Sequence, residues 1–166
     1  MPLLPPNRRE VVLGTATLPL LFATQARAEL TPRHGFNDAE IAWMLFDEGA
    51  ALARREGRPI FLLGHTTWCP HCEATKPNFF DDRVVTLLDG FVPILIDRDE
   101  QPELNARYAP DGGYVPRVMV LDQNAELITK VQGPLADYRH LIPYDSPEPL
   151  RQFIQIGRLF TDLPEI

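Results

Sequence analysis

The chain has 166 residues, of which 45% are hydrophobic, and a formal net charge of −7. This length suits one domain with a core of its own, and the negative charge argues against nucleic acid as a partner. The two cysteines are Cys69 and Cys72, only three positions apart. This placement excludes the dispersed disulfide framework of small secreted proteins, so the pair needs a chemical explanation.

The first 28 residues are typical of a targeting segment. Arg8 and Arg9 precede an apolar run at residues 11–22, and a small-x-small sequence ends at Ala28. This order of features predicts a signal peptide at residues 1–28 that is cleaved after Ala28. Cleavage removes three arginines and one glutamate, which changes the formal charge from −7 to −9.

The arginine pair resembles a twin-arginine signal, although Val11 stands where that signal usually has an aromatic residue. General secretory export is the alternative, and either route leads out of the cytoplasm. The apolar run is shorter than the roughly 20 residues that span a bilayer, so no permanent membrane anchor is expected. Residues 29–166 are predicted to form a single domain.

The first element predicted in the mature chain is an amphipathic helix that starts near Asn37 and ends at Gly57. Its apolar positions recur at helical spacing and are Ile41, Met44, Leu45 and Leu52. The continuous apolar run at residues 59–64 predicts a central strand covered on both faces, because such a strand has no polar side. This strand leads directly to the cysteine pair.

A helix is predicted from Pro70 to about Phe80, with a kink at Pro77 because proline lacks a backbone donor. The later predicted elements are a short helix at 83–88, a strand at 91–96, a helix at 101–108, a hairpin of strands at 117–121 and 126–131, and a closing helix at 147–160. Alternating helices and strands followed by an antiparallel pair predict the α/β class, with a mixed central sheet flanked by helices on both faces.

The cysteine pair at the start of a helix has a clear chemical logic. Unpaired backbone donors and the positive end of the helix dipole stabilise a thiolate at Cys69, and Cys72 lies about one turn further along. We therefore expect Cys69 to attack and Cys72 to resolve. Pro70 suits the first helical turn, and His71 offers a charge or a donor to the Cys69 sulfur. A stabilised thiolate favours the reduced form, so the pair is expected to act as an oxidant.

Zinc binding and haem attachment are two other uses of a cysteine pair. Zinc needs four ligands, and only His65 and His71 lie near the cysteines in sequence. Covalent haem attachment needs a histidine after the second cysteine, where this chain has Glu73. We therefore expect no metal and no other cofactor.

Two motifs resemble a known family. The segment 68–72 reads Trp-Cys-Pro-His-Cys, and Pro77 follows at the spacing of the kinking proline of the thioredoxin superfamily. Its central Pro-His also resembles the DsbA-type periplasmic oxidants. The segment 108–122, Tyr-Ala-Pro-Asp-Gly-Gly-Tyr-Val-Pro-Arg-Val-Met-Val-Leu-Asp, resembles the small endoplasmic-reticulum thioredoxin-like proteins and their anterior-gradient relatives. His65 and Tyr144 fit the same family, and the similarity covers roughly residues 37–160.

The resemblance implies a thioredoxin-like fold and several site residues. Pro116 is then the cis-proline beside the active site, Val115 offers backbone groups to an extended substrate, and Trp68 is a third substrate-binding residue. Thioredoxins usually hold a buried carboxylate six residues before the first cysteine, but this chain has Leu63 there. The proton of Cys72 would then leave through water or another group, with His65 and Glu73 as candidates. For His65, a packing role is favoured over proton transfer.

The expected function is a bacterial, periplasmic thiol–disulfide oxidoreductase. It would exchange the Cys69–Cys72 disulfide or dithiol with cysteine-containing exported proteins, and a membrane redox partner would recycle it. One alternative is a periplasmic reductase. The other is a non-catalytic module that binds clients or copper.

Overall fold

The computed structural model describes residues 34–163, so the expected signal peptide at 1–28 lies outside the described residues. A three-stranded sheet runs in the order β2-β1-β3 and consists of β1 (Ile60–His65), β2 (Val92–Asp97) and β3 (Arg117–Leu121). β1 is parallel to β2 and antiparallel to β3. The central strand is the apolar run of the sequence, and every residue in it is buried.

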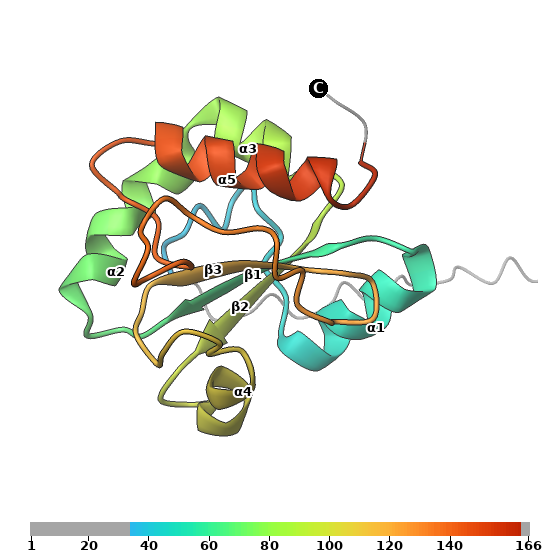
Figure 1. The fold of residues 1–166 in the computed structure, drawn as a ribbon, viewed down its shortest axis with the longest axis horizontal. Helices are drawn as coiled ribbons and strands as arrows, with labels where there is room; N and C mark the ends of the chain where they lie inside the picture. Colours follow the sequence, from blue (N-terminus) through green and yellow to red (C-terminus); the bar gives the residue numbers. More distant parts are fainter. Residues whose placement is uncertain (1–33, 164–166) are drawn as a thin grey trace, which may run out of the picture.

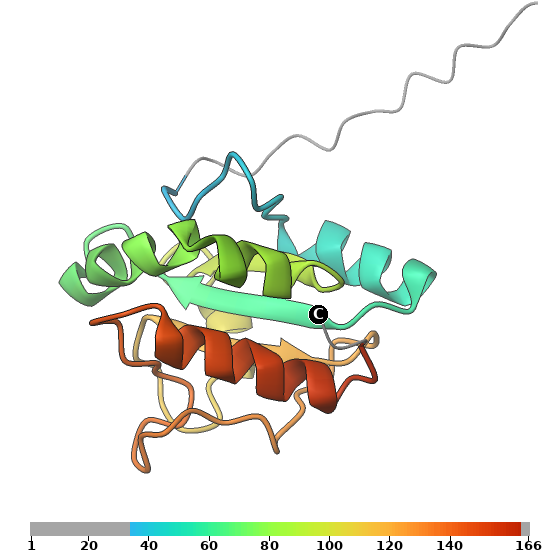
Figure 2. The ribbon, with the colours of Figure 1, turned by 90° about the horizontal axis from the view of Figure 1, so that it is seen from above.

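Helices cover both faces of this sheet (Figure 1), which confirms the predicted fold class. The helices are α1 (Phe46–Glu56), α2 (Pro70–Thr75), the 3-10 helix η1 (Lys76–Phe80), α3 (Asp82–Leu88), α4 (Pro102–Arg107) and α5 (Glu148–Leu159). α3 and α5 lie side by side across β1 (Figure 2), while α1 and α4 lie on the other face. No helix within residues 34–163 is long and apolar enough to cross a membrane.

The side chains of β1 point alternately to the two faces of the sheet, and the core accordingly has two parts. Phe61 and Leu63 pack with the cysteines and with the α3 and α5 side, whereas Ile60 and Leu62 pack with the α1 side. Side chains of a strand point alternately to opposite faces, so a strand that is apolar throughout can fill both. The cysteine pair therefore follows closely after the C-terminal end of a central strand that is buried on both faces.

The prediction of the first helix is wrong for the first half of its range. Residues 37–45 form turns and an isolated parallel bridge between Met44 and Ile94, and α1 begins only at Phe46. The Met44 amide donates to the carbonyl of Pro93 at 3.0 Å, which covers an edge of β2. Ile41 packs on the α3 and α5 side of the sheet while Met44 packs on the α1 side, so their helical spacing does not mark one helix face. The predicted end at Gly57 is confirmed, since this glycine has a φ of 66°.

The predicted hairpin is confirmed only at its turn. The Asp122 amide donates to Glu126, but the second arm forms only an isolated bridge between Leu121 and Leu127. Nearer the start of β3, the Val118 amide instead donates to the carbonyl of His140 at 2.8 Å. Two separate segments thus share the outer edge of β3, which leaves no room for a full second strand.

The helix after the cysteines changes character at the predicted kink. α2 ends at Thr75, and Lys76–Phe80 continue as the 3-10 helix η1 with Pro77 in its first turn. Proline removes the donor that an α-helix needs at this point, so a tighter helix replaces it.

Candidate active site

Cys69 and Cys72 occupy different environments at the start of α2. Cys69 is the N-cap residue, directly before Pro70, and 6% of it is exposed. Cys72 lies one turn further along and is fully buried. A residue at the N-cap faces the unpaired amides of the first turn, where a thiolate is stabilised. The placement fits Cys69 as the attacking sulfur and Cys72 as the resolving sulfur.

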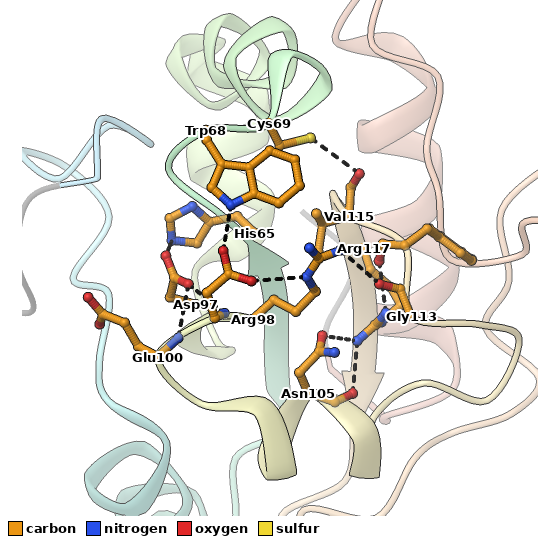
Figure 3. Close-up of polar contacts among 12 residues, drawn as sticks. His65, Trp68, Cys69, Asp97, Arg98, Glu100, Asn105, Gly113, Val115 and Arg117 are labelled. Carbon is orange, nitrogen blue, oxygen red and sulfur yellow. Dashed lines mark hydrogen bonds and ion pairs between the residues drawn. The ribbon is translucent and has the colours of Figure 1, made fainter.

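A second segment meets Cys69 from the far side of the site. The Cys69 sulfur lies 3.6 Å from the carbonyl oxygen of Val115 (Figure 3). The peptide bond between Val115 and Pro116 is cis, as the resemblance implied. The residues predicted from sequence, Cys69, Val115 and Pro116, are therefore brought together, and their role in holding a substrate remains a prediction.

Burial controls the chemistry of the resolving thiol. Desolvation raises the pKa of Cys72 to about 12, and the neighbouring Cys69 acts in the same direction. The backbone amide of Thr66 opposes this rise by bonding to the sulfur. Cys72 is consequently a neutral thiol near pH 7.

Alkylation should separate the two thiols. We expect a small haloacetamide added to the reduced protein near pH 6 to modify Cys69 before Cys72, because Cys69 keeps a small exposed fraction of 6% whereas Cys72 has none and is held as the unreactive thiol. Peptide mass spectrometry after brief labelling measures the order. Earlier labelling of Cys72 would reverse the roles assigned to the two sulfurs.

Trp68 precedes the attacking cysteine and is 62% exposed. Its indole nitrogen donates to the carboxylate of Asp99 at 2.5 Å, and the Arg98 guanidinium lies 5.1 Å from the ring centre. Arg98 also reaches the carbonyl of Gly113, in the loop that leads to Pro116 (Figure 3). The exposed ring is thus fixed between two loops at the edge of the site, which fits the predicted contact with a substrate. Sequence reasoning did not find Arg98 or Asp99, which carry no motif.

His71 is exposed on α2, and its Nδ1 atom meets the hydroxyl of Tyr144. These residues are 73 positions apart, so no local pattern connects them. Tyr144 was singled out only through the family resemblance.

His65 ends β1 and is 2% exposed. Its Nε2 atom lies 4.0 Å from the carboxylate of Asp97, the residue beside it in β2. Burial lowers the pKa of His65 to about 4, and the nearby His34 acts in the same direction, while Asp97 opposes them. A weakly basic imidazole cannot readily take the proton of a thiol whose pKa is raised. The environment therefore supports the packing role for His65.

Acid should destabilise the protein through His65. The pKa of His65 is lowered in the folded state. The stability that the neutral side chain contributes is therefore fully present above about pH 6.5 and is lost as the pH falls toward 4. We expect the free energy of unfolding to fall by about 2 kcal/mol more between pH 7 and pH 5 in the parent protein than in His65→Phe. Urea unfolding at both pH values measures this difference. An equal fall in the free energy of unfolding in the two proteins would contradict the conclusion that His65 is buried as a neutral side chain.

The position that usually carries a buried carboxylate is apolar in the structure. Leu63 is fully buried and pairs with Leu95 and Val118 in the neighbouring strands. The other candidate, Glu73, is mostly exposed and bonds to Lys76 at 2.5 Å. Neither the Leu63 position nor Glu73 offers a buried base for Cys72. Of the acceptors that the sequence suggests for the Cys72 proton, water therefore remains.

Arg117 organises the loop that carries Val115. Its side chain is fully buried and donates to the carbonyls of Gly112 and Tyr114 and to the backbone and side-chain oxygens of Asn105. Desolvation lowers the pKa of Arg117. A single guanidinium thus ties the loop before β3 to α4 (Figure 3).

Within residues 34–163, no group of three or more His, Cys, Asp and Glu side chains could hold a metal ion.

A family model and several known proteins match this chain in sequence. A family model described as thioredoxin-like matches residues 42–123. Anterior gradient protein 3 of Xenopus tropicalis is 29% identical over 140 residues, which cover 82% of this chain and 84% of that protein. Anterior gradient protein 1 of the same species is 32% identical over 97 residues, and there the match spans only 50% of the relative.

A solved structure supports the fold independently. The crystal structure of a disulphide isomerase from Xylella fastidiosa Temecula1 superposes with a TM-score of 0.50 at 24% identity, over 66% of this chain and 86% of that one. This likeness concerns the arrangement of the helices and strands.

Proposed function

The chain belongs to the thioredoxin-like family, and on this premise we propose that it is an exported thiol–disulfide oxidoreductase that oxidises cysteines of other exported proteins. The observation that carries the proposal is the sulfur of Cys69 at the N-terminus of α2, 3.6 Å from the Val115 carbonyl and backed by the buried Cys72. A sulfur that lies nearer the surface than its fully buried partner, beside a backbone carbonyl, suits disulfide exchange.

The exchange proceeds in two displacements. A client thiolate attacks the Cys69 sulfur of the disulfide form, a mixed disulfide forms, and Cys72 leaves as a thiolate that takes a proton from water. A second client thiolate then attacks the client sulfur of the mixed disulfide and releases Cys69 as a thiolate. The client loses two electrons and gains a disulfide, and the enzyme is left as the dithiol. The raised pKa of Cys72 favours protonation of its sulfur once it has left.

Oxidation is proposed as the direction because Cys69 lies at a helix N-terminus and His71 lies on the same turn as the pair. Both features stabilise the reduced form and so make the disulfide more oxidising. A periplasmic reductase is the alternative direction, and a measured reduction potential separates the two.

Removing the histidine should shift the redox equilibrium. We expect His71→Ala to make the disulfide less oxidising by about 30 mV, which corresponds to about 1.4 kcal/mol for this two-electron couple, because the Cys69 thiolate loses a nearby donor. Equilibration with glutathione, followed by acid quenching and alkylation, measures the potential. A potential that stays the same within error would show that His71 has no influence on the sulfur.

Export and recycling belong to the same proposal. The signal features at residues 1–28 support export, and the exposed Trp68 beside Cys69 supports contact with large, cysteine-containing clients. A membrane redox partner would reoxidise the dithiol after each turnover. Cell fractionation of the full-length chain in a bacterial host tests the compartment.

The activity itself is tested with a reduced, unfolded protein that has several cysteines. The oxidised enzyme should transfer one disulfide per molecule, and Cys69→Ala should transfer none. If the parent transfers no disulfides, or if purified protein retains copper in a metal assay, the non-catalytic binding role is favoured instead.

A further inference from the structure

We infer that the hydroxyl of Tyr144 is the positioning group for His71, and that through His71 it tunes the redox equilibrium of the cysteine pair. The inference rests on the proposed function, because it concerns how the same site is adjusted. It adds a residue from the loop before α5, outside the segments that carry the cysteines and Pro116.

The contact joins two parts of the chain that only the fold brings together. The Tyr144 hydroxyl meets Nδ1 of His71, and the ring centres lie 5.7 Å apart at an interplanar angle of 49°. His71 is exposed, so its ring would otherwise sample several rotamers. This contact selects one of them.

Tyr144 is itself held firmly enough to act as an anchor. The buried Asn78 side chain donates to the Tyr144 carbonyl at 3.3 Å. The two residues before Tyr144, Ile142 and Pro143, line the same small cavity as Asn78 and Pro116. The backbone at Tyr144 is therefore tied to η1, and the residues before it lie beside the cis-proline segment, which gives the tyrosine a defined place from which to hold His71.

The direction we infer for the hydrogen bond is from Tyr144 to Nδ1, because a phenol is a stronger donor than the N–H of a neutral imidazole. In this tautomer the histidine hydrogen is on Nε2, since a neutral imidazole carries only one. Nε2–H is then the donor that His71 can offer to a sulfur that develops negative charge.

Tyr144→Phe removes this hydrogen bond and keeps the ring. The measured quantity is the equilibrium constant for oxidised protein plus two glutathione molecules giving reduced protein plus glutathione disulfide. We expect the constant to fall roughly three- to tenfold, the effect of losing one hydrogen bond, in the same direction as in His71→Ala. Tyr138→Phe is the matched control, because this exposed tyrosine makes its ring contact with Tyr114 instead, and its constant should not change.

A double-mutant cycle distinguishes positioning from a general structural effect. If Tyr144 acts through His71, then Tyr144→Phe should have no further effect in the His71→Ala protein. An unchanged constant in the single variant, or an equal fall in the presence and absence of His71, would overturn the inference. Failure of the parent to oxidise a reduced client would instead count against the proposed function, since the glutathione equilibrium is measured without a client.

Discussion

Replacing Cys72 with alanine should trap the protein covalently on its clients. The variant cannot form the Cys69–Cys72 disulfide, but its Cys69 thiolate at the N-terminus of α2 can attack a disulfide that a client already contains. The mixed disulfide that results then has no Cys72 thiol beside it to displace the client. We therefore expect reducible, high-mass adducts to accumulate when the variant is expressed with its own export signal. Acid quenching followed by a non-reducing gel detects them, and mass spectrometry identifies the clients.

The double variant Cys69→Ala/Cys72→Ala is the matched control, and it should form no adducts. Circular dichroism of the single variant shows whether it is folded, and alkylation shows whether its Cys69 thiol is free to react. A folded, alkylatable single variant without adducts would mean that exchange with proteins is not the task of this chain.

Removing the buried guanidinium should have the largest effect on stability. Arg117 is fully buried and donates to backbone carbonyls of Gly112, Tyr114 and Asn105. Arg117→Met fills much of the same space with apolar atoms but leaves these oxygens without their donor. We expect the free energy of unfolding to fall by about 2–4 kcal/mol, and urea unfolding measures it.

The matched control is Arg107→Met, at the exposed end of α4. Arg107 forms an exposed ion pair with Glu126 at 4.0 Å and lies 5.3 Å from the centre of the Tyr108 ring, so the change should stay within about 0.5 kcal/mol. The loop that carries Val115 depends on Arg117, so we also expect slower disulfide transfer in the folded fraction of Arg117→Met. A stability equal to that of the control would show that the guanidinium does not hold this loop.

Much of the fold could be read from local patterns. The apolar run of β1 and the proline at the change from α2 to η1 were both predicted, because burial on two faces and a missing donor leave direct traces in the sequence. The errors share one cause. Met44 pairs with the distant strand β2, and the arm after Ala125 shares the edge of β3 with the distant segment at His140, so non-local contacts override the local spacing in both places.

The sequence by itself determined where the candidate active site lies. Two cysteines separated by Pro70 and His71 at a helix start predict that Cys69 attacks and Cys72 resolves, because the helix terminus acts over a single turn. Only the tertiary structure decided what surrounds the sulfurs. Val115, Tyr144 and Asp99 reach Cys69, His71 and Trp68 across separations of 46, 73 and 31 positions. Contacts of this kind depend on how strands and loops pack, and no periodicity within either segment encodes them.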